Sequence, residues 1–445
     1  MIKIGMAKVD LEQALRPANP IRERVEAIAL YAQSEAVHTV WVVLDFMDFN
    51  LNVVNTLKAA VCKETGLAMD DVHIMTTHNH GAGTPELETL ARLTAQCAAQ
   101  AKKTAAPAKM RSAHTVPDRQ VNFLRRMEVP EFDGVTTLFW GTGRHDGYNS
   151  APFVESAVQR IIAGQGPSYT GFAPTTRPAK PFPPADPDIF VLELRTMDDG
   201  PIGNIVRFAT HVNTANRVGS FSSDFPYHLR RVMQEHLGGT PMFMTGPCAD
   251  ICPGMESKTS GEEAVLGPYL AERALAALEG AEFAPVEQFD ARMQAVSLPV
   301  HQAVLDEDVG ISPEMPEELP ARMRWLEAQR MQNSMPFLRE KYTYGETELK
   351  ETVDIHLGML RFNDLVIAAF PGETFSETAK AVCDAFPGTD IVTVTEHERT
   401  VMYLPPLADC ARGGYETTCR VTSDAAEAVL RDAAMKLTDS FIKGE

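Results

Sequence analysis

The hydrophobic and polar residues of this chain follow two different periods. Apolar runs of strand length occupy residues 39–44, 72–76 and 365–370. Residues 51–65 and 86–103 instead repeat their apolar positions at the three-to-four-residue spacing of an amphipathic helix. Because strand-like and helix-like segments alternate along most of the length, the pattern predicts an α/β fold with a mixed sheet core and flanking helices.

The centre of the chain predicts a hairpin that leads into a helix. An apolar run at residues 189–194 is followed by a turn signal at residues 198–200 and by a strand that ends at His211. Beyond Asp224, which is a good N-cap, apolar residues recur at helical spacing.

Two further segments bear on the domain organisation. Residues 167–187 are so rich in proline, which fixes the φ angle, that we expect an irregular surface loop there. Residues 305–350 include a helical stretch rich in Glu, Arg and Met, which we interpret as a helical insertion, either a lid or a plainly packed helix. No internal repeat or low-complexity tract is evident, and the length allows one large domain or two to three ordinary ones, of which we expect a single domain over residues 1–445.

Three of the predicted strands end in a residue that can bind a metal. His78 follows the run at residues 72–76, and His211 ends the second hairpin strand. Glu373 follows the run at residues 365–370. The carboxyl ends of strands are where α/β sheets place their sites, and two imidazoles with one carboxylate form the ligand set of a catalytic zinc. The pattern therefore predicts a metallohydrolase.

A second histidine accompanies the first. In an extended segment, residues i and i+2 face the same way, so His78 and His80 can reach one centre. Each of these side chains also has a plainer interpretation. A histidine is more often a surface or hydrogen-bonded core residue, and Glu373 suits the first turn of a helix. The set of residues, rather than any one of them, favours a metal.

Composition narrows the function classes. The net charge is −19, from 60 acidic and 41 basic residues, which argues against nucleic acid or an anionic membrane as the main partner. The hydrophobic content of 44% and the charged content of 23% are typical of a globular protein. No apolar run reaches the ~18 residues of a membrane span, and we expect no signal peptide. Because the cysteines are also odd in number and scattered, we expect a cytoplasmic protein with reduced thiols.

Several short motifs occur in an order that points to one known family. They are the opening strand at residues 4–10, Thr-His-Asn-His-Gly at 77–81, Thr-His at 210–211 with Ser-Ser-Asp-Phe-Pro at 222–226, Pro-Gly-Glu-Thr-Phe at 371–375, Tyr-Leu-Pro at 403–405 and Gly-Gly-Tyr-Glu at 413–416. On these residues the chain resembles the neutral/alkaline, non-lysosomal ceramidase superfamily, a group of zinc amidases, over roughly residues 1–420.

The resemblance implies a zinc ion held by His78, His211, Glu373 and Tyr403, with His80 beside it. Tyr403 enters by the resemblance alone, because a lone tyrosine after a strand is usually a half-buried packing residue.

Three departures separate the chain from the ceramidases of that family. Their Gly-Asp-x-Ser-Pro motif reads Ala-Asp-Ile-Cys-Pro at residues 249–253, so Cys252 replaces a serine with a nucleophilic or substrate-orienting role. We also expect this chain to lack the family's C-terminal β-sandwich domain and its secretion signal. For these reasons we expect a small soluble amide as the substrate rather than ceramide.

The roles of two residues in this motif stay open. Cys252 is either a nucleophile, activated near zinc or a histidine, or a small buried residue that lines the pocket. Asp250 either orients a ligand histidine or caps a turn. Cys248 and Cys252 could instead form a structural zinc site with Cys410 and Cys419, although the spacings suit such a site poorly.

The leading hypothesis is hydrolysis of a C–N amide bond by a zinc-activated water, with His80 as general base or as the group that polarises the carbonyl. The same centre also suits an ester or a lactone. A non-catalytic binding protein that keeps the fold is the alternative outside enzymes, and the intact His78, His211 and Glu373 argue against it. The partner we expect is a small-molecule amide, and a homo-oligomer is a candidate state of assembly.

Overall fold

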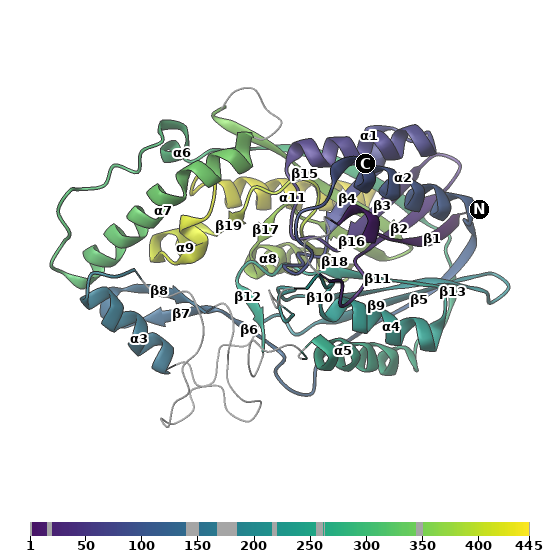
Figure 1. Ribbon diagram of the computed structural model, residues 1–445. Coiled ribbons are helices and arrows are strands. Elements are labelled where there is room, and N and C mark those ends of the chain that lie inside the picture. The colour runs from purple at the N-terminus through teal and green to yellow at the C-terminus, as the bar shows by residue number, and fades with distance from the viewer. Residues whose placement is uncertain are drawn as a thin grey trace.

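The computed structural model describes residues 2–15, 20–138, 151–166, 185–215, 220–254, 261, 263–343 and 350–444. Two β-sheets pack face to face, and helices cover the outer face of each sheet (Figure 1). This is the α/β fold with a mixed sheet core and flanking helices that the sequence predicts, so the predicted fold class is confirmed.

The larger sheet of the described residues has nine strands. β3 with β4 and β10 with β11 are parallel pairs, whereas the remaining neighbours are antiparallel. In spatial order the strands are β11 (Thr240–Thr245), β10 (Pro201–Phe208), β9 (Ile189–Thr196), β5 (Ala106–Thr115), β1 (Lys3–Asp10), β2 (Glu26–Gln33), β3 (His38–Leu44) and β4 (Val72–Thr76), with β13 (Ala284–Pro285) paired to β5.

The smaller sheet contributes the other half of the core. Its strands, in spatial order, are β14 (Phe289–Pro299), β15 (Thr352–Phe362), β16 (Leu365–Ala369) and β18 (Asp390–Val394). β16 and β18 run parallel. The apolar core between the sheets takes Ile28, Trp41 and Leu192 from the larger sheet and Leu360 and Ile367 from the smaller one. Each sheet therefore buries both of its faces, because its outer face is covered by helices.

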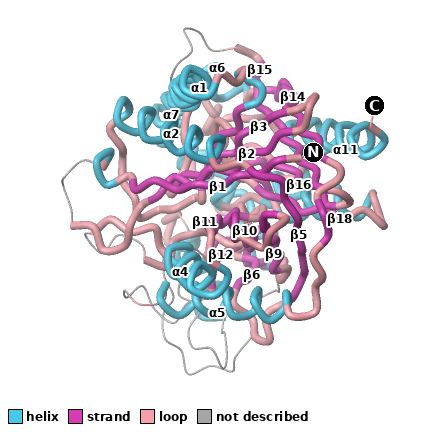
Figure 2. The backbone as a smooth tube through the Cα atoms, turned by 90° about the vertical axis from the view of Figure 1, so that its right-hand side faces the viewer, coloured by secondary structure: helices cyan, strands magenta, loops and turns pink. Residues whose placement is uncertain are grey.

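Two helix pairs cover the outer face of the larger sheet. They are α1 (Leu51–Thr65) with α2 (Leu87–Lys103), and α4 (Phe225–Leu237) with α5 (Glu263–Leu278). Figure 2 shows these pairs apart, with strands between them. On the outer face of the smaller sheet lie α8 (Ser376–Ala385) and α11 (Ala426–Lys443).

Short strand pairs and further helices extend this core. The strand pairs are β6 (Asn122–Leu124) with β12 (Ile251–Pro253), β7 (Arg126–Val129) with β8 (Gly134–Thr137), and β17 (Glu373–Thr374) with β19 (Tyr403–Leu404). The helices are α3 (Ala151–Ile162), α6 (Gln302–Asp306), α7 (Leu319–Thr343), α9 (Leu407–Arg412) and α10 (Tyr415–Thr418), with 3₁₀ turns at Glu12–Ala14, Met69–Asp71 and Pro130–Phe132. None of the helices in the described ranges is long and apolar enough to cross a membrane.

The predicted elements of the central region are confirmed. The predicted hairpin is β9 and β10, and Asp199 in its turn has a φ of 66°. α4 begins after Asp224, whose carboxylate accepts a hydrogen bond from the backbone N–H of Phe225. The proline-rich segment 167–187 lies outside the described residues except for 185–187.

The stretch interpreted as an insertion contains α7. Pro320 lies in its first turn, where the missing N–H of proline has no helical partner to lose. Met323 packs with an apolar cluster that includes Phe132, and Met331 packs into the core beside the smaller sheet. α7 is therefore held by apolar packing and is not a solvated helix.

A histidine at the end of β5 joins the two sheets. The ring nitrogens of His114 lie 2.8 Å from Oδ1 of Asp188, which precedes β9, and 3.0 Å from Oδ1 of Asp390 in β18. The hydrogen bond to Asp188, followed by the one to Asp390, raises the pKa of His114 to about 10.

We predict that His114→Gln lowers the free energy of unfolding most below about pH 6.5, the usual histidine value. A folded-state pKa of about 10 means that the stabilisation is complete below the unfolded pKa and is lost as the pH rises through about 10. Urea unfolding of the variant and the wild type at about pH 6, 8 and 10 measures the difference. Because all three side chains are partly exposed, we expect a modest effect. An equal difference at every pH would contradict this assignment.

Candidate metal centre

The loops that carry the candidate histidines are joined to each other. His78 and His80 follow β4, and His211 follows β10. A short bridge pairs Asn79 with Val212, and the backbone N–H of His80 donates to the carbonyl of Val212 at 3.1 Å. His78 has a φ of 57°, which turns the chain away from the direction of β4. Two strand ends that are distant in the sequence thus deliver imidazoles to one place.

The candidate ligands lie at separations that suit a shared metal ion. Ring nitrogens of His78, His80 and His211 are within 4.8 Å of one another. Oε2 of Glu373 is 3.5 Å from Nε2 of His78 and 3.3 Å from Nε2 of His211. Two ligands about 2.0–2.2 Å from a zinc ion, at the tetrahedral angle, are themselves about 3.3–3.6 Å apart. Among the described residues, buried Nε2 of His78 and buried Oε2 of Glu373 have no hydrogen-bond partner, so the donor set fits a metal.

A sharp turn after β16 places Glu373. Gly372 has a φ of 49°, and a Cβ added there would lie 3.0 Å from the carbonyl oxygen of Met402. The pairing of β17 with β19 then sets Glu373 directly opposite Tyr403. The tyrosine that the resemblance implies therefore lies beside the carboxylate, and its role as a ligand stays a prediction.

Arg125, which the sequence did not single out, lies at the centre of this network. Its side chain is 1% exposed and donates from Nη1 to Nε2 of His211 at 3.0 Å and from Nη2 to the hydroxyl of Tyr403 at 2.9 Å. Nδ1 of His211 faces the carbonyl of Ile251 at 2.8 Å, so Nε2 carries the lone pair that Arg125 contacts. A metal bound to His211 would displace this hydrogen bond from Arg125.

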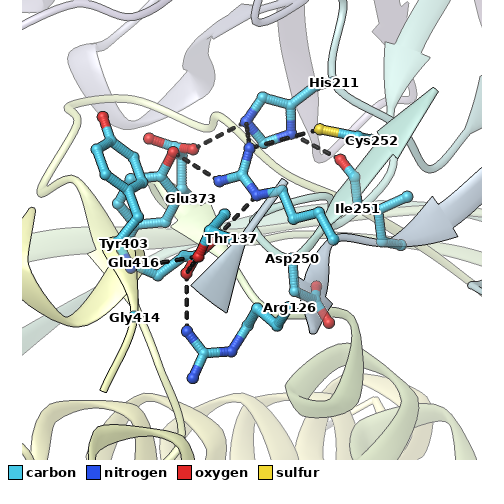
Figure 3. A network of polar contacts seen from close by, with 12 residues as sticks. Arg126, Thr137, His211, Asp250, Ile251, Cys252, Glu373, Tyr403, Gly414 and Glu416 are labelled. Carbon is cyan, nitrogen blue, oxygen red and sulfur yellow. Dashed lines mark hydrogen bonds and ion pairs between the residues drawn. The ribbon is translucent and has the colours of Figure 1, made fainter. Parts of the chain in front are cut away.

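Glu416 connects Arg125 with a second arginine. Its Oε1 accepts from Nε of Arg125 at 2.9 Å, and its Oε2 accepts from Nη1 of Arg126 at 2.7 Å and from the hydroxyl of Thr137 at 2.9 Å. Figure 3 shows Glu416 between Arg126 and the rest of the network. Burial alone would raise the pKa of Glu416, but Arg125 and Arg126 lower it. Both oxygens of this buried carboxylate are therefore used to fix arginines.

The protonation states of the candidate ligands differ. Burial alone would lower the pKa of His78, but Glu396 and Glu373 raise it well above its usual value. Burial, followed by the charge of Arg125, lowers the pKa of His211 to about 4. Burial would raise the pKa of Glu373, but His78 and His211 lower it well below its usual value. At neutral pH, His211 is therefore neutral and Glu373 is ionised, as metal ligands must be.

The other ring nitrogen of His78 faces two acceptors. Nδ1 lies 3.2 Å from the carbonyl of Met47 and 3.1 Å from Oε1 of Glu396. Partners on this nitrogen fix the tautomer in which Nε2 offers its lone pair to a metal. Glu396 was not predicted, although the same signal that identified Glu373 was available, because it closely follows the apolar strand β18.

His80 differs from the other two histidines in its exposure. His78 and His211 are buried, whereas His80 is only partly buried. Its ring centre lies 5.0 Å from that of His78 and 5.9 Å from that of His211. The structure thus brings His80 beside the candidate ligands, as the sequence predicts, and it is the least buried of the three histidines.

Cys252 lies one residue after Ile251, whose carbonyl faces His211. It is 0% exposed, belongs to β12, and packs with Phe123 and Met127 in an apolar cluster. Burial raises the pKa of its thiol to about 11, even though Nη1 of Arg125 lies 3.7 Å from the sulfur. The thiol is protonated at neutral pH, which favours the pocket-lining role over the nucleophilic one.

Asp250 has a different partner from the one proposed as its first alternative. Its carboxylate accepts from the backbone N–H of Ser376 at 2.9 Å and from the hydroxyl of Ser376 at 2.8 Å. Figure 3 shows Asp250 apart from His211, with no contact drawn between them. The side chain therefore caps the start of α8, which is the capping alternative. Its backbone carbonyl accepts from the N–H of Arg125 at 2.9 Å.

The alternative cysteine site finds no support in the geometry. In the part of the chain that the structure describes, neither cluster of potential metal ligands contains a cysteine. The sulfur of Cys410 instead lies 3.1 Å from Nη1 of Arg420.

Comparison with known proteins bears on the fold. No protein-family model matches the chain, and no curated protein matches it by sequence. Among solved structures, the neutral ceramidase from Pseudomonas aeruginosa superposes with a TM-score of 0.66 at 14% sequence identity, covering 99% of this chain and 74% of that one. The chain has a neutral ceramidase fold. A ceramidase complexed with C2 gives a TM-score of 0.66 at 14% identity, covering 99% of this chain and 75% of its own.

The ceramidase fold confirms the resemblance that the sequence motifs indicated. The superposition covers 99% of this chain, and its sequence identity of 14% supports the fold rather than an activity. The ligand and catalytic roles of individual residues therefore stay predictions that rest on the geometry above.

We predict that Asp250→Ala lowers the free energy of unfolding by about 1 kcal/mol, because it leaves two partly buried donors of Ser376 without their acceptor. Ser376→Ala removes only the hydroxyl contact and should cost less. Chemical denaturation of both variants measures the difference. A loss of activity in Asp250→Ala without any loss of stability would contradict the capping role.

Proposed function

We propose that this protein is a metal-dependent hydrolase that cleaves the C–N amide bond of a small soluble substrate, with Zn²⁺ as the metal. The observation that carries the proposal is the meeting of three imidazoles with the Glu373 carboxylate inside a ceramidase fold. Proteins use this donor set to hold zinc.

His78, His211 and Glu373 are the residues proposed to hold the ion, with Tyr403 as a fourth by resemblance. Zinc in such a site lowers the pKa of a water molecule and polarises a carbonyl group. Neutral His211 and ionised Glu373 are ready to bind without first losing a proton. His78 must release one, because its pKa is raised.

The surrounding residues supply the rest of the proposed chemistry. His80 is next to the candidate ligands and only partly buried, and we assign it the role of general base that accepts the proton of the attacking water. Arg125 directs Nη1 and Nη2 toward the centre while Glu416 holds its Nε. A buried guanidinium fixed in this way stabilises the negative charge that develops on a carbonyl oxygen during hydrolysis.

The proposed substrate class rests on the likeness to ceramidase structures and on the differences from the ceramidase sequence motifs. The two solved structures are described as ceramidases, which supports an amide bond as the target. Cys252 in place of the family's serine supports a substrate other than theirs. We therefore propose a small soluble amide.

We predict that Glu373→Gln abolishes metal-dependent amidase activity. Removing a ligand charge should cost more than the 10–100-fold that loss of an outer partner typically costs. The activity of the wild type is identified by screening a library of N-acyl amides for released amine, with and without chelator. Added Zn²⁺ should restore the activity that the chelator removes from the wild type.

Glu377→Gln is the matched control for this experiment, because Glu377 is exposed in the first turn of α8 and should leave activity unchanged. Wild-type protein that binds no metal, or activity that is indifferent to chelator, would overturn the proposal in favour of a binding protein. A larger rate acceleration on matched esters than on amides would favour an esterase or lactonase.

We predict that Cys252→Ala keeps turnover within about tenfold of the wild type, because a buried thiol with a pKa of about 11 is protonated at neutral pH. Steady-state kinetics and the zinc content of the purified variant measure the outcome. A drop of about 10⁴-fold or more with zinc retained would instead establish Cys252 as the nucleophile.

A further inference from the structure

Glu396 is a buried carboxylate whose position the proposed chemistry does not yet explain. Its side chain is 2% exposed, and Oε1 lies 3.1 Å from Nδ1 of His78. On the far side of the same ring, Oε2 of Glu373 lies 3.5 Å from Nε2. Two carboxylates therefore flank one imidazole, one at each nitrogen.

The other buried charges around the centre are balanced by partners of opposite sign. Arg125 pairs with Glu416, Arg126 pairs with Glu416 and Asp409, and Lys58 pairs with Glu398 at 2.8 Å. Among the described residues, the ion pair of Glu396 is with His78, which also faces the carboxylate of Glu373. Burying a carboxylate is costly unless a positive charge compensates it.

The backbone around Glu396 is held in a conformation that is unusual for residues other than glycine. Glu396 and Glu398 have φ angles of 59° and 63°, a left-handed conformation that side chains other than glycine adopt only under strain. His397 between them donates from its N–H to the carbonyl of Phe370 at 3.0 Å, and Glu398 donates to that of Ile74 at 2.7 Å. The segment thus ties the end of β16 to β4.

These ties link the segment to two of the three strands that deliver candidate ligands. β4 leads to His78, and β16 leads to Glu373, whose neighbour Gly372 accepts a hydrogen bond from the hydroxyl of Thr395 at 2.6 Å. The strained backbone therefore aims the Glu396 carboxylate at His78 from a support that is shared with Glu373.

We propose that Glu396 is a positioning residue for a divalent cation, and that it acts through His78. It holds the N–H of Nδ1 on its own side, so that Nε2 offers its lone pair to the cation, and its charge is compensated together with that of Glu373. The two negative charges of Glu396 and Glu373 then balance the two positive charges of the cation. The inference rests on the metal centre of the proposed function.

The test compares the wild type with Glu396→Gln, which keeps the shape of the side chain and removes its charge. Zn²⁺ alone, titrated in competition with a chromophoric chelator, should bind about 10–100-fold more weakly to the variant. Asp48→Asn is the control, since it removes a negative charge from the neighbouring loop of Met47. It should leave the Zn²⁺ affinity within about threefold of the wild type.

Thermal unfolding separates positioning from a purely structural role. In chelator, the variant should unfold at the same temperature as the wild type or higher, because one of the two buried carboxylates that flank the single imidazole of His78 has lost its charge. In excess Zn²⁺ the variant should unfold at a lower temperature than the wild type, because weaker Zn²⁺ binding stabilises its folded state less. A fall of equal size in both conditions would overturn the proposal, as would unchanged Zn²⁺ affinity.

Glu396→Asp retains the charge one methylene further from His78 and should lose less affinity than Glu396→Gln. It also serves as the test if Glu396→Gln does not fold, and a loss of affinity below twofold in this variant would then overturn the proposal. Wild-type protein that binds no Zn²⁺ would overturn the proposed function as well. Wild-type binding together with equal binding by Glu396→Gln would overturn this inference alone.

Discussion

The arrangement of this site depends on the interaction of His78 with two buried carboxylates. Glu373 faces one ring nitrogen and Glu396 the other, and both come from the region of the smaller sheet, whereas His78 comes from the larger one. Because buried charges demand compensation, this contact links the two sheets to each other and to any cation held between them.

A second polar network completes the centre from the other side. Glu416 holds Arg125 and Arg126, and Arg125 reaches His211 and Tyr403. The two networks meet at Glu373 and His211, which lie 3.3 Å apart. Glu416 thus fixes the two arginines, whereas Glu373 and Glu396 flank the imidazole of His78.

The elements that carry these residues are ordinary in their sequence. β4 and β16 are short apolar strands, and each is followed by a turn in which a residue adopts a positive φ, namely His78 and Gly372. The turn at Glu396 is of the same kind and follows β18. The fold therefore repeats one local device, a buried strand and a left-handed turn, to bring polar side chains to one edge of the core.

The sequence by itself determined the α/β class, the hairpin of β9 and β10, and the group His78, His80, His211 and Glu373, because each of these depends on a local pattern of strand and following turn. Only the tertiary structure decided that Arg125 lies against His211, that Asp250 caps α8, and that Glu396 faces His78. Those contacts join residues 86, 126 and more than 300 positions apart. The hydrophobic pattern of the sequence does not predict these contacts, because the partner of each buried polar group depends on how the two sheets pack together.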